Sequence, residues 1–491
     1  MATEKMSKTD EKMRIYVIFS SSGLQDECRI YPIYHPEQEI VKNEKVLDEL
    51  KNRCKDVEFV GKTVSIRGEK AEYTIAKIRS QRESLDGVVF FGLPWDELLS
   101  IDLPVVAVYP LWGQWMALSA YIGKKIVLTL FNAYIGKKVL TSCLPMLYDK
   151  DRAIFSSRLN DIAKKIKVIR AISKMKKLKV LVVTDLPVLG YFEPGSHQAV
   201  PTREKYEKVY LDNLKEAFGT EFVPIPQEEL FEKMNEMKEE EAKEVARKWI
   251  DEAKSLKGMN EAGTIKSAKL YLAMKNLMEK YDCGAITTEG YGWPGWDYKR
   301  GELPSQGLPS SQLCTEGVVA TSETLTDSLL TQQLGLYLWN STGFDGDYVV
   351  DFFNNITVIG HCECPFNPYG DERKVPYVIR NLPYQEENVG GACVQVNLPA
   401  DETVTVAKIG THDKKISVFT GKSVCGESLF TYWYDILCRT KLAIRADGKA
   451  LLKNLDWKAF GFHRVVFYGD HRQEIKDLAT LIGFEVVEVD K

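Results

Sequence analysis

The sequence contains no stretch that would cross a membrane or build a disulfide framework. No uninterrupted apolar run approaches the roughly 20 residues that span a bilayer, and the polar N-terminus has no apolar signal-peptide segment. The 10 cysteines are spread thinly over 491 residues without a CxxC pair, which is typical of reduced thiols. We therefore expect a soluble, cytoplasmic protein with no membrane partner.

The chain also has no excess of either charge. Its 65 Lys and Arg residues stand against 69 Asp and Glu residues, which gives a formal net charge of -4 at pH 7. This balance provides no general electrostatic attraction to nucleic acid, so we expect neutral or small anionic ligands instead.

Motifs of three common enzyme classes are missing as well. The sequence has no GxxxxGK(S/T) phosphate loop, no GxGxxG after a predicted strand and no GxSxG turn. These absences disfavour ATP chemistry, dinucleotide redox chemistry and an α/β-hydrolase nucleophile. The remaining candidates are carboxylates and a few of the 6 histidines, which suit acid–base and divalent-metal chemistry.

Short apolar runs alternate with amphipathic stretches over most of the chain, which is typical of α/β domains. Residues 14–19, 87–92, 104–110 and 179–185 are predicted strands, and a basic helix over 159–177 precedes the last of them. After residue 348 the runs become β-branched and aromatic, with turn residues between them, which indicates antiparallel strands. We therefore predict two doubly wound parallel-sheet α/β domains over residues 1–175 and 176–348, followed by a mostly antiparallel, barrel-like β domain over 349–491.

The segment from residue 283 to 330 contains the most unusual sequence. Its strand CGAITT runs into Glu289, which places this carboxylate at the carboxyl end of a parallel strand, where open α/β sheets build their sites. By itself, Glu289 is better explained as a surface or helix-capping carboxylate. The long loop that follows contains Trp293 and Trp296, and its length favours a functional loop over a bare connector.

Glu323 and Asp327 lie four residues apart in a predicted helix, so their carboxylates share one helical face. The same segment, ATSETLTDS, also has the composition of a helix start, so a capping pair is an equally good interpretation. Among the histidines, His361 is predicted as a buried strand-end residue, with a pocket-lining role as the alternative. His463 precedes the strand RVVFYGD and is either a loop residue or a neutral imidazole ligand.

Three of these segments, in this order, resemble the L-fucose isomerase and L-arabinose isomerase superfamily, in its divergent fucose-isomerase-like branch. AITTEG (285–290) is similar to the segment that supplies the first carboxylate of that family, and residues 310–334 to the segment that supplies the second. Residues 461–486 resemble the C-terminal segment that supplies a histidine ligand. The three-domain organisation agrees with this resemblance.

The resemblance implies a metal-dependent aldose–ketose isomerase that works through an enediol. Carried over by position, Glu289 and His463 are metal ligands, and Glu289 is also catalytic. Many relatives have Cys-Glu-x-Asp at the second carboxylate, where this chain has Ser-Glu-Thr-Leu at 322–325. Glu323 and Asp327 are therefore nearly equal candidates for that ligand and acid–base group, with Glu316 a distant third.

The resemblance also implies Mn²⁺ or Mg²⁺ as the cofactor, a sugar substrate and a homo-oligomer, either a trimer or a hexamer. Trp293, Trp296 and His361 would contact the substrate. The irregular middle motif keeps open a non-catalytic sugar-binding or regulatory protein of the same fold. An enzyme for a sugar acid or sulfonated sugar is a further alternative, because Lys299 and Arg300 follow the first carboxylate.

Overall fold

The computed structural model describes residues 12–21, 36–66, 71–91, 98, 101, 103–110, 139–144, 152–185, 200–289, 303–382, 390–424 and 438–491. The chain divides into two compact units, one of Met1–Ser173 with Lys476–Gly483 and the other of Lys174–Ile475 with Phe484–Lys491. The second and third of the predicted domains therefore lie, apart from a short helical segment, within the second unit.

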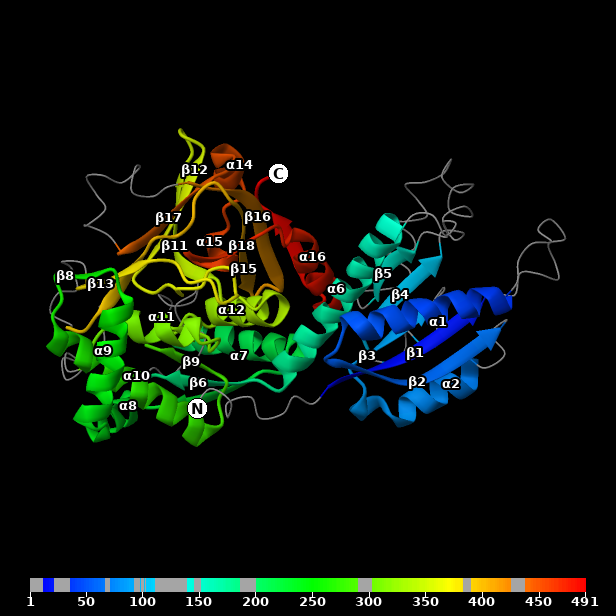
Figure 1. The fold of residues 1–491 in the computed structure, drawn as a ribbon, viewed down its shortest axis with the longest axis horizontal. Helices are drawn as coiled ribbons and strands as arrows, with labels where there is room; N and C mark the ends of the chain where they lie inside the picture. The colour runs from blue at the N-terminus through cyan, green and yellow to red at the C-terminus, as the bar shows by residue number, and fades with distance from the viewer. Residues whose placement is uncertain are drawn as a thin grey trace. The chain divides into compact units, whose positions relative to one another are not determined.

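The first unit is built on a five-stranded parallel sheet with strand order β2-β1-β3-β4-β5 (Figure 1). In the inner strand β1, every residue from Ile15 to Phe19 is buried, as expected where helices cover both faces of a parallel sheet. The elements of this unit are β1 (Met13–Ser21), α1 (Pro36–Arg53), β2 (Val57–Ile66), α2 (Ala71–Ser80), η1 (Arg82–Ser84), β3 (Gly87–Phe91), β4 (Val105–Pro110), β5 (Val139–Leu144) and most of α6 (Arg152–Lys176).

The second unit begins with a four-stranded parallel sheet of order β10-β9-β6-β7. Its elements are β6 (Lys179–Val183), α7 (Val200–Ala217), β7 (Glu221–Ile225), α8 (Gln227–Glu236), α9 (Glu239–Glu252), α10 (Glu261–Tyr281), β9 (Ala285–Thr288), α11 (Gly307–Thr315), β10 (Ala320–Thr321) and α12 (Thr326–Trp339). Helix α10 ends at Asp282, which takes the left-handed conformation with φ +54°. The fully buried β9 follows at once and delivers Glu289 at its carboxyl end.

The remaining strands of the second unit form a closed antiparallel barrel. Six strands pair around it in the order β15-β18-β11-β12-β17-β16, and β16 pairs back to β15. They are β11 (Phe344–Asp351), β12 (Ile356–His361), β15 (Thr403–Gly410), β16 (Lys415–Val424), β17 (Thr440–Arg445) and β18 (His463–Tyr468). The predicted fold class, parallel-sheet α/β followed by a barrel-like β region, is therefore confirmed.

Smaller elements complete the second unit. A three-stranded sheet of order β14-β13-β8 contains β8 (Ser255–Lys257), β13 (Tyr377–Arg380) and β14 (Cys393–Val396), and β19 (Glu485–Glu488) adds to β16 in parallel. Three helices, α14 (Gly448–Lys453), α15 (Trp457–Phe460) and α16 (Arg472–Ile482), connect the last strands. Residues of α16 from Lys476 onward belong to the first unit.

Helix α12 joins the sheet to the barrel in the second unit. It contacts β9 and β10 on the side of the sheet, and β15, β18 and β11 on the side of the barrel. The approach to β18 is close, because a Cβ atom at Gly335 would overlap the ring of Phe467. This packing sets the carboxyl end of β9 and the loop before α12 beside the barrel. Within the described part of the chain, no helix combines the length and the apolar character that a membrane crossing requires.

Candidate metal centre

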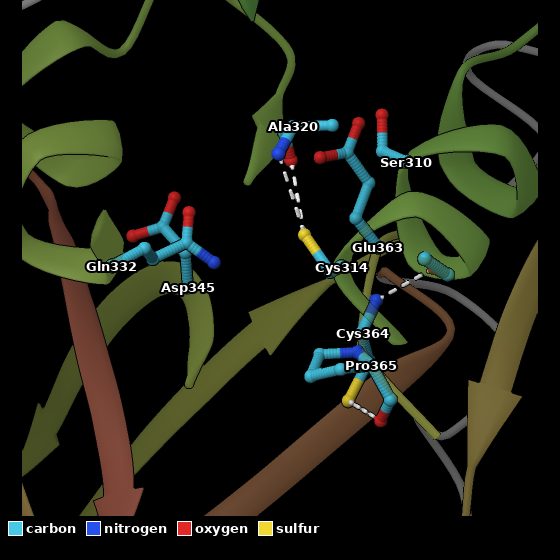
Figure 2. A pocket seen from close by; sticks show the side chains of 9 residues that line it. Ser310, Cys314, Ala320, Gln332, Asp345, Glu363, Cys364 and Pro365 are labelled. Carbon is cyan, nitrogen blue, oxygen red and sulfur yellow. Dashed lines mark hydrogen bonds between the residues drawn. The ribbon is translucent and has the colours of Figure 1, made fainter. Parts of the chain in front are cut away.

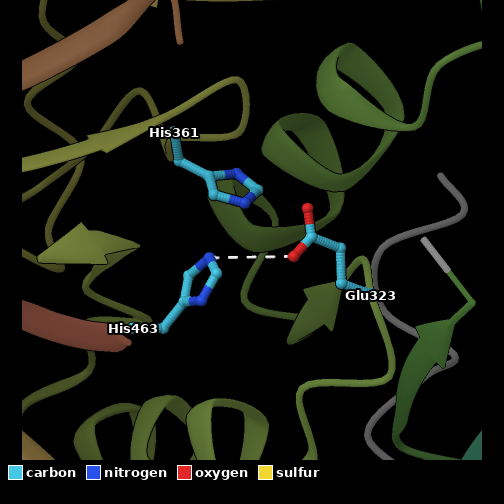
Figure 3. A group of neighbouring side chains, drawn as sticks. All are labelled: Glu323, His361 and His463. Atoms are coloured by element: carbon cyan, nitrogen blue, oxygen red, sulfur yellow. Dashed lines mark ion pairs between the residues drawn. The ribbon is translucent and has the colours of Figure 1, made fainter. Parts of the chain in front are cut away.

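Glu323 lies on a strained loop between β10 and α12. Its backbone φ is +64° and that of Thr324 is +52°, so two consecutive non-glycine residues occupy the left-handed region. Each such residue costs roughly 1–3 kcal/mol and persists only where the surroundings fix it. Here the N–H of Thr324 donates to the carbonyl of Thr288, at the end of β9, over 2.8 Å. The loop is thereby held with the Glu323 carboxylate facing two histidines of the barrel (Figure 3).

These histidines come from the ends of two barrel strands. His361 is the last residue of β12, and His463 is the first residue of β18. Strand β11 runs between them, and its Asp347 lies opposite both Gly360 and His463 in the register. The register therefore brings the two imidazoles to the same end of the barrel, with ring centroids 5.4 Å apart.

Glu323, His361 and His463 form a group that could hold a metal ion. One ligand atom from each lies within 4.8 Å of the others, and Glu323 Oε2 is 4.0 Å from His463 Nε2. His463 is 1% exposed and His361 6%, whereas the side chain of Glu323 keeps 27% of its surface in solvent. Imidazole and carboxylate together suit divalent transition metals, and the carboxylate suits Mn²⁺ and Mg²⁺.

Both imidazoles are neutral at physiological pH. Burial lowers the pKa of His361 to about 4. The pKa of His463 also lies well below its ordinary value, first because of burial and then because of His361, Lys408 and Arg464 nearby. Neither ring nitrogen of His463 has a hydrogen-bond partner among the described residues. A buried polar group without a partner costs about 1–3 kcal/mol, so this ring fits a bound ligand such as a metal ion.

Asp347 adds a second carboxylate beside His463, which the sequence analysis did not single out. Its Oδ1 lies 3.9 Å from His463 Nε2. Desolvation raises the pKa of this carboxyl to about 6, while half of its side-chain surface still reaches solvent. The only signal in the sequence is the polar Asp in the alternating strand FDGDYVVD, and its meaning depends on the pairing of β11 with β18.

Glu363 connects the two sides of this group. Its backbone N–H donates to His361 Nδ1 over 3.2 Å, and its carboxyl accepts the N–H of Ser322 over 3.3 Å, one residue before Glu323. The side chain is partly buried, and desolvation together with the charge of Asp345 raises the pKa of the carboxyl to about 8. Glu363 is therefore a neutral acid at pH 7 that holds both a histidine and the strained loop.

Glu363 also lines a small polar cavity (Figure 2). The cavity has a water-accessible volume of about 10 Å³, which is room for the centre of one water molecule. Asp345, Ser310 and Gln332 also line it, and neither Ser310 Oγ nor Gln332 Oε1 has a hydrogen-bond partner among the described residues.

Glu289 lies at the end of β9 as predicted from its place in the sequence, but it is not a member of the Glu323, His361 and His463 group. Its Oε2 accepts hydrogen bonds from Thr184 Oγ1, the backbone N–H of Asp185 and Gln227 Nε2. The carboxylate is 4% exposed and ties the ends of β6 and β9 to the start of α8. Its role as a ligand and catalytic group stays a prediction.

Asp327 also lies apart from the group, in the first turn of α12. Its carboxylate accepts hydrogen bonds from the hydroxyl of Tyr210 and from both the N–H and the hydroxyl of Thr411. Of the two nearly equal candidates for the second carboxylate, the structure therefore places Glu323 beside His463 and Asp327 in a structural hydrogen-bond network. Trp293 and Trp296, predicted to contact the substrate, lie outside the described residues.

Comparisons with known proteins add little to this geometry. No protein-family model matches the chain, and no curated protein matches it in sequence. Among solved structures, the arabinose-binding protein AraP from Geobacillus stearothermophilus matches 66% of this chain and 88% of its own length, with 11% sequence identity and a TM-score of 0.14. At this TM-score, the likeness assigns neither a fold nor a ligand to this chain.

Proposed function

We propose that the chain is a metal-dependent isomerase that interconverts an aldose and a ketose at the barrel end of the second unit. The observation that carries the proposal is the His463 imidazole, which is buried, neutral and without a hydrogen-bond partner beside the carboxylates of Glu323 and Asp347. The family resemblance of residues 285–290, 310–334 and 461–486 supplies the reaction class.

Glu323, His361 and His463 would hold a divalent ion, with the carboxylate of Asp347 beside His463. The mixed oxygen and nitrogen set fits Mn²⁺ better than Mg²⁺, because imidazole is a ligand for transition metals. A bound ion would polarise the carbonyl of the sugar and hold two adjacent oxygens in place.

The proton transfers would fall to carboxylates of the chain. Isomerisation moves one proton between adjacent carbons and another between adjacent oxygens, and a group with a pKa near the working pH does this best. Asp347 suits the task, because its carboxyl has a pKa of about 6 and half of its side-chain surface reaches solvent. Burial of the two imidazoles excludes water from the inner side of the site.

The proposal is tested with Mn²⁺ binding and with turnover. Mn²⁺ titrations followed by electron paramagnetic resonance compare the wild type with His463→Ala, Glu323→Gln and the control His412→Gln, whose ring stacks on Tyr206 away from the group. We expect the first two variants to lose affinity by at least about tenfold, as is typical for a lost ligand, and the control to match the wild type. Equal affinity in all four proteins would refute the metal site.

Turnover is measured with a panel of aldoses and ketoses in deuterated solvent. We expect Mn²⁺-dependent ketose formation and deuterium at C2 for at least one sugar, and loss of both in His463→Ala. Glu289→Gln separates the two roles of Glu289. The family resemblance predicts loss of turnover in this variant, whereas a purely structural carboxylate predicts a loss of stability with turnover retained.

A non-catalytic sugar-binding protein is the second candidate function. The observation that favours it is Glu289, whose carboxylate is already engaged by three donors instead of facing the metal group. This function predicts sugar binding without any exchange of the C2 proton with solvent, in the presence or absence of Mn²⁺. The predicted homo-oligomer is checked separately by light scattering.

A further inference from the structure

Three cysteine side chains from separate segments pack together next to the candidate metal centre. Cys362 follows His361 directly at the end of β12, Cys393 begins β14, and Cys438 lies two residues before β17. Cys362 and Cys393 form a buried cluster with Leu382, and Cys438 packs against this cluster. All three are thiols and not disulfides. Because they lie far apart in the chain, no spacing motif in the sequence indicates the cluster.

Cys438 is the member of this cluster that solvent reaches. It is partly exposed, whereas Cys362 is 8% exposed and Cys393 is fully buried. The ammonium group of Lys441 donates a hydrogen bond to the backbone carbonyl of Cys438. A positive charge close to a thiol favours the thiolate, which is the form that peroxides oxidise. Access and a nearby cation therefore make Cys438 the reactive thiol of the three.

Other buried cysteines are poor targets for an oxidant. Burial raises the pKa of the Cys54 and Cys283 thiols to about 11 and that of Cys314 to about 12. Burial also raises the pKa of Cys364 well above its ordinary value. These thiols stay protonated at neutral pH, so they react slowly with peroxide.

The packing favours Cys362 over Cys393 as the partner of Cys438. A Cβ atom at Gly360 would lie 4.0 Å from the Cβ of Cys438, so Cys438 packs against the end of β12, just before Cys362. Cys393 is fixed, because its Sγ donates to a backbone carbonyl over 3.2 Å and its Cβ would lie only 2.7 Å from a Cβ at Gly307. A disulfide needs the two Cβ atoms within about 4 Å, and only a cysteine that can shift reaches this geometry.

We propose that Cys438 and Cys362 are a peroxide-sensitive thiol pair that closes to a disulfide beside the candidate metal centre. The Sγ of Cys438 attacks hydrogen peroxide, the O–O bond breaks, water leaves and Cys438 becomes a sulfenic acid. The Sγ of Cys362 then attacks this sulfur, the S–O bond breaks, and a second water carries away the thiol proton. Two thiols and one peroxide thereby become one disulfide and two water molecules.

The disulfide changes the surroundings of His361. Closing the bond draws the two sulfur atoms together to about 2.05 Å, which pulls on the end of β12. Cys362 follows His361 directly, and His361 pairs with Thr440, two residues after Cys438. We therefore expect weaker binding of a divalent metal in the oxidised protein. This consequence rests on the proposed metal site, whereas the thiol pair itself does not.

The pair is identified by peptide mapping. Hydrogen peroxide is added to the metal-free full chain, the remaining thiols are blocked with N-ethylmaleimide, and the peptides are analysed by mass spectrometry without reductant. We expect a linked peptide that contains Cys362 and Cys438, the loss of two thiols per chain, and full reversal by dithiothreitol. A map without this linked peptide, or with Cys438 linked to Cys393, overturns the inference.

Two variants separate the two chemical steps. In Cys362→Ala the second step is blocked, so we expect the sulfenic acid of Cys438 to accumulate and to be trapped by dimedone. In Cys438→Ser we expect no linked peptide and thiol loss at least about tenfold slower at the same peroxide concentration. Cys283→Ser is the matched control and should oxidise like the wild type. Equal rates of thiol loss in Cys438→Ser and the wild type would show that another thiol reacts first, which refutes the inference.

Metal binding tests the link to the candidate metal centre. Mn²⁺ titrations compare the reduced and the oxidised wild type after the peroxide is removed. We expect the oxidised form to bind at least about tenfold more weakly, as is typical when groups around a metal ligand are disturbed, and peroxide-treated Cys438→Ser to match the reduced wild type. Equal affinity of the two wild-type forms overturns the link. Absence of Mn²⁺ binding to the reduced wild type overturns only the proposed function, because the thiol pair is mapped without metal.

Discussion

The desolvated carboxyl of Glu363 makes the stability of the second unit depend on pH. Its pKa rises from an ordinary value of 4.5 to about 8 in the folded protein, mainly because burial penalises the charged form. Between these two values the unfolded chain releases the proton and the folded chain keeps it. The contribution of Glu363 is therefore most favourable below its ordinary pKa and is lost as the pH rises toward 8.

The size of this effect follows from the pKa difference. From 4.5 to pH 7 is 2.5 pH units, and each unit corresponds to about 1.4 kcal/mol, so keeping Glu363 protonated costs about 3 kcal/mol at pH 7. Glu363→Gln removes this cost, because the amide is neutral at every pH. Its oxygen can still accept the Ser322 N–H.

We therefore expect Glu363→Gln to be more stable than the wild type by about 3 kcal/mol at pH 7 but by only about 0.8 kcal/mol at pH 5. The assay is urea unfolding without metal at both pH values, followed by hydrogen exchange of peptides from β11 and β12, so that the transition belongs to the second unit. Glu244→Gln, on the exposed side of α9, is the matched control. A stability difference for Glu363→Gln that does not change with pH would refute the reasoning.

Three further predictions concern the strained loop, the packing of α12 and the second carboxylate. Glu323→Asn should raise the free energy of unfolding of the metal-free protein in urea by about 1 kcal/mol, because Asn tolerates the left-handed φ of this position. It should also weaken Mn²⁺ binding, and an unchanged free energy of unfolding would argue against backbone strain. Gly335→Ala should lower the free energy of unfolding by about 1–3 kcal/mol, since its methyl group meets the Phe467 ring, and an unchanged melting temperature would contradict this packing. Mn²⁺ affinity should fall by about tenfold per pH unit below pH 6 as Asp347 protonates, and Asp347→Asn should remove that dependence.

Much of the fold could be predicted from the sequence because its parallel strands are buried on both faces. Continuous apolar runs mark β1, β3, β4 and β6, and the structure has a strand at each of them. The closure of the barrel could not be predicted, because it depends on pairings between residues far apart in the chain, such as β15 with β18 and β11 with β18. For the same reason β14, which has the same composition as the barrel strands, pairs with β13 in a separate sheet.

The candidate site was predictable only where one segment decides the position of a residue. The position of Glu289 could be predicted because it follows the last residue of β9, and the position of His463 because it begins β18. The hydrogen bonds that engage Glu289 come from residues around positions 184 and 227, and Asp347 reaches His463 through strand pairing. Neither the hydrogen bonds of Glu289 nor the strand pairing of Asp347 produces a pattern in the nearby sequence that could be recognised.

The sequence also could not decide between Glu323 and Asp327, although these carboxylates are only four residues apart. The two carboxylates would share a helical face if the helix began before Glu323, but α12 begins at Thr326. Two left-handed residues precede it, and they turn Glu323 toward the barrel while Asp327 stays in the first turn beside Tyr210. The backbone strain therefore decides which carboxylate reaches His463.

This strain is sustained by contacts on both sides of the loop. The Thr324 N–H donates to the carbonyl of Thr288 at the end of β9, and the Ser322 N–H donates to the carboxyl of Glu363 after β12. On the other side of the loop, α12 packs closely against β18 at Gly335. The metal group therefore combines a residue placed by the parallel sheet with histidines placed by the barrel. Since an ion bound there would contact both layers at once, metal binding and the docking of the sheet on the barrel must stabilise each other. A variant that loosens α12 should then weaken metal binding without touching a ligand.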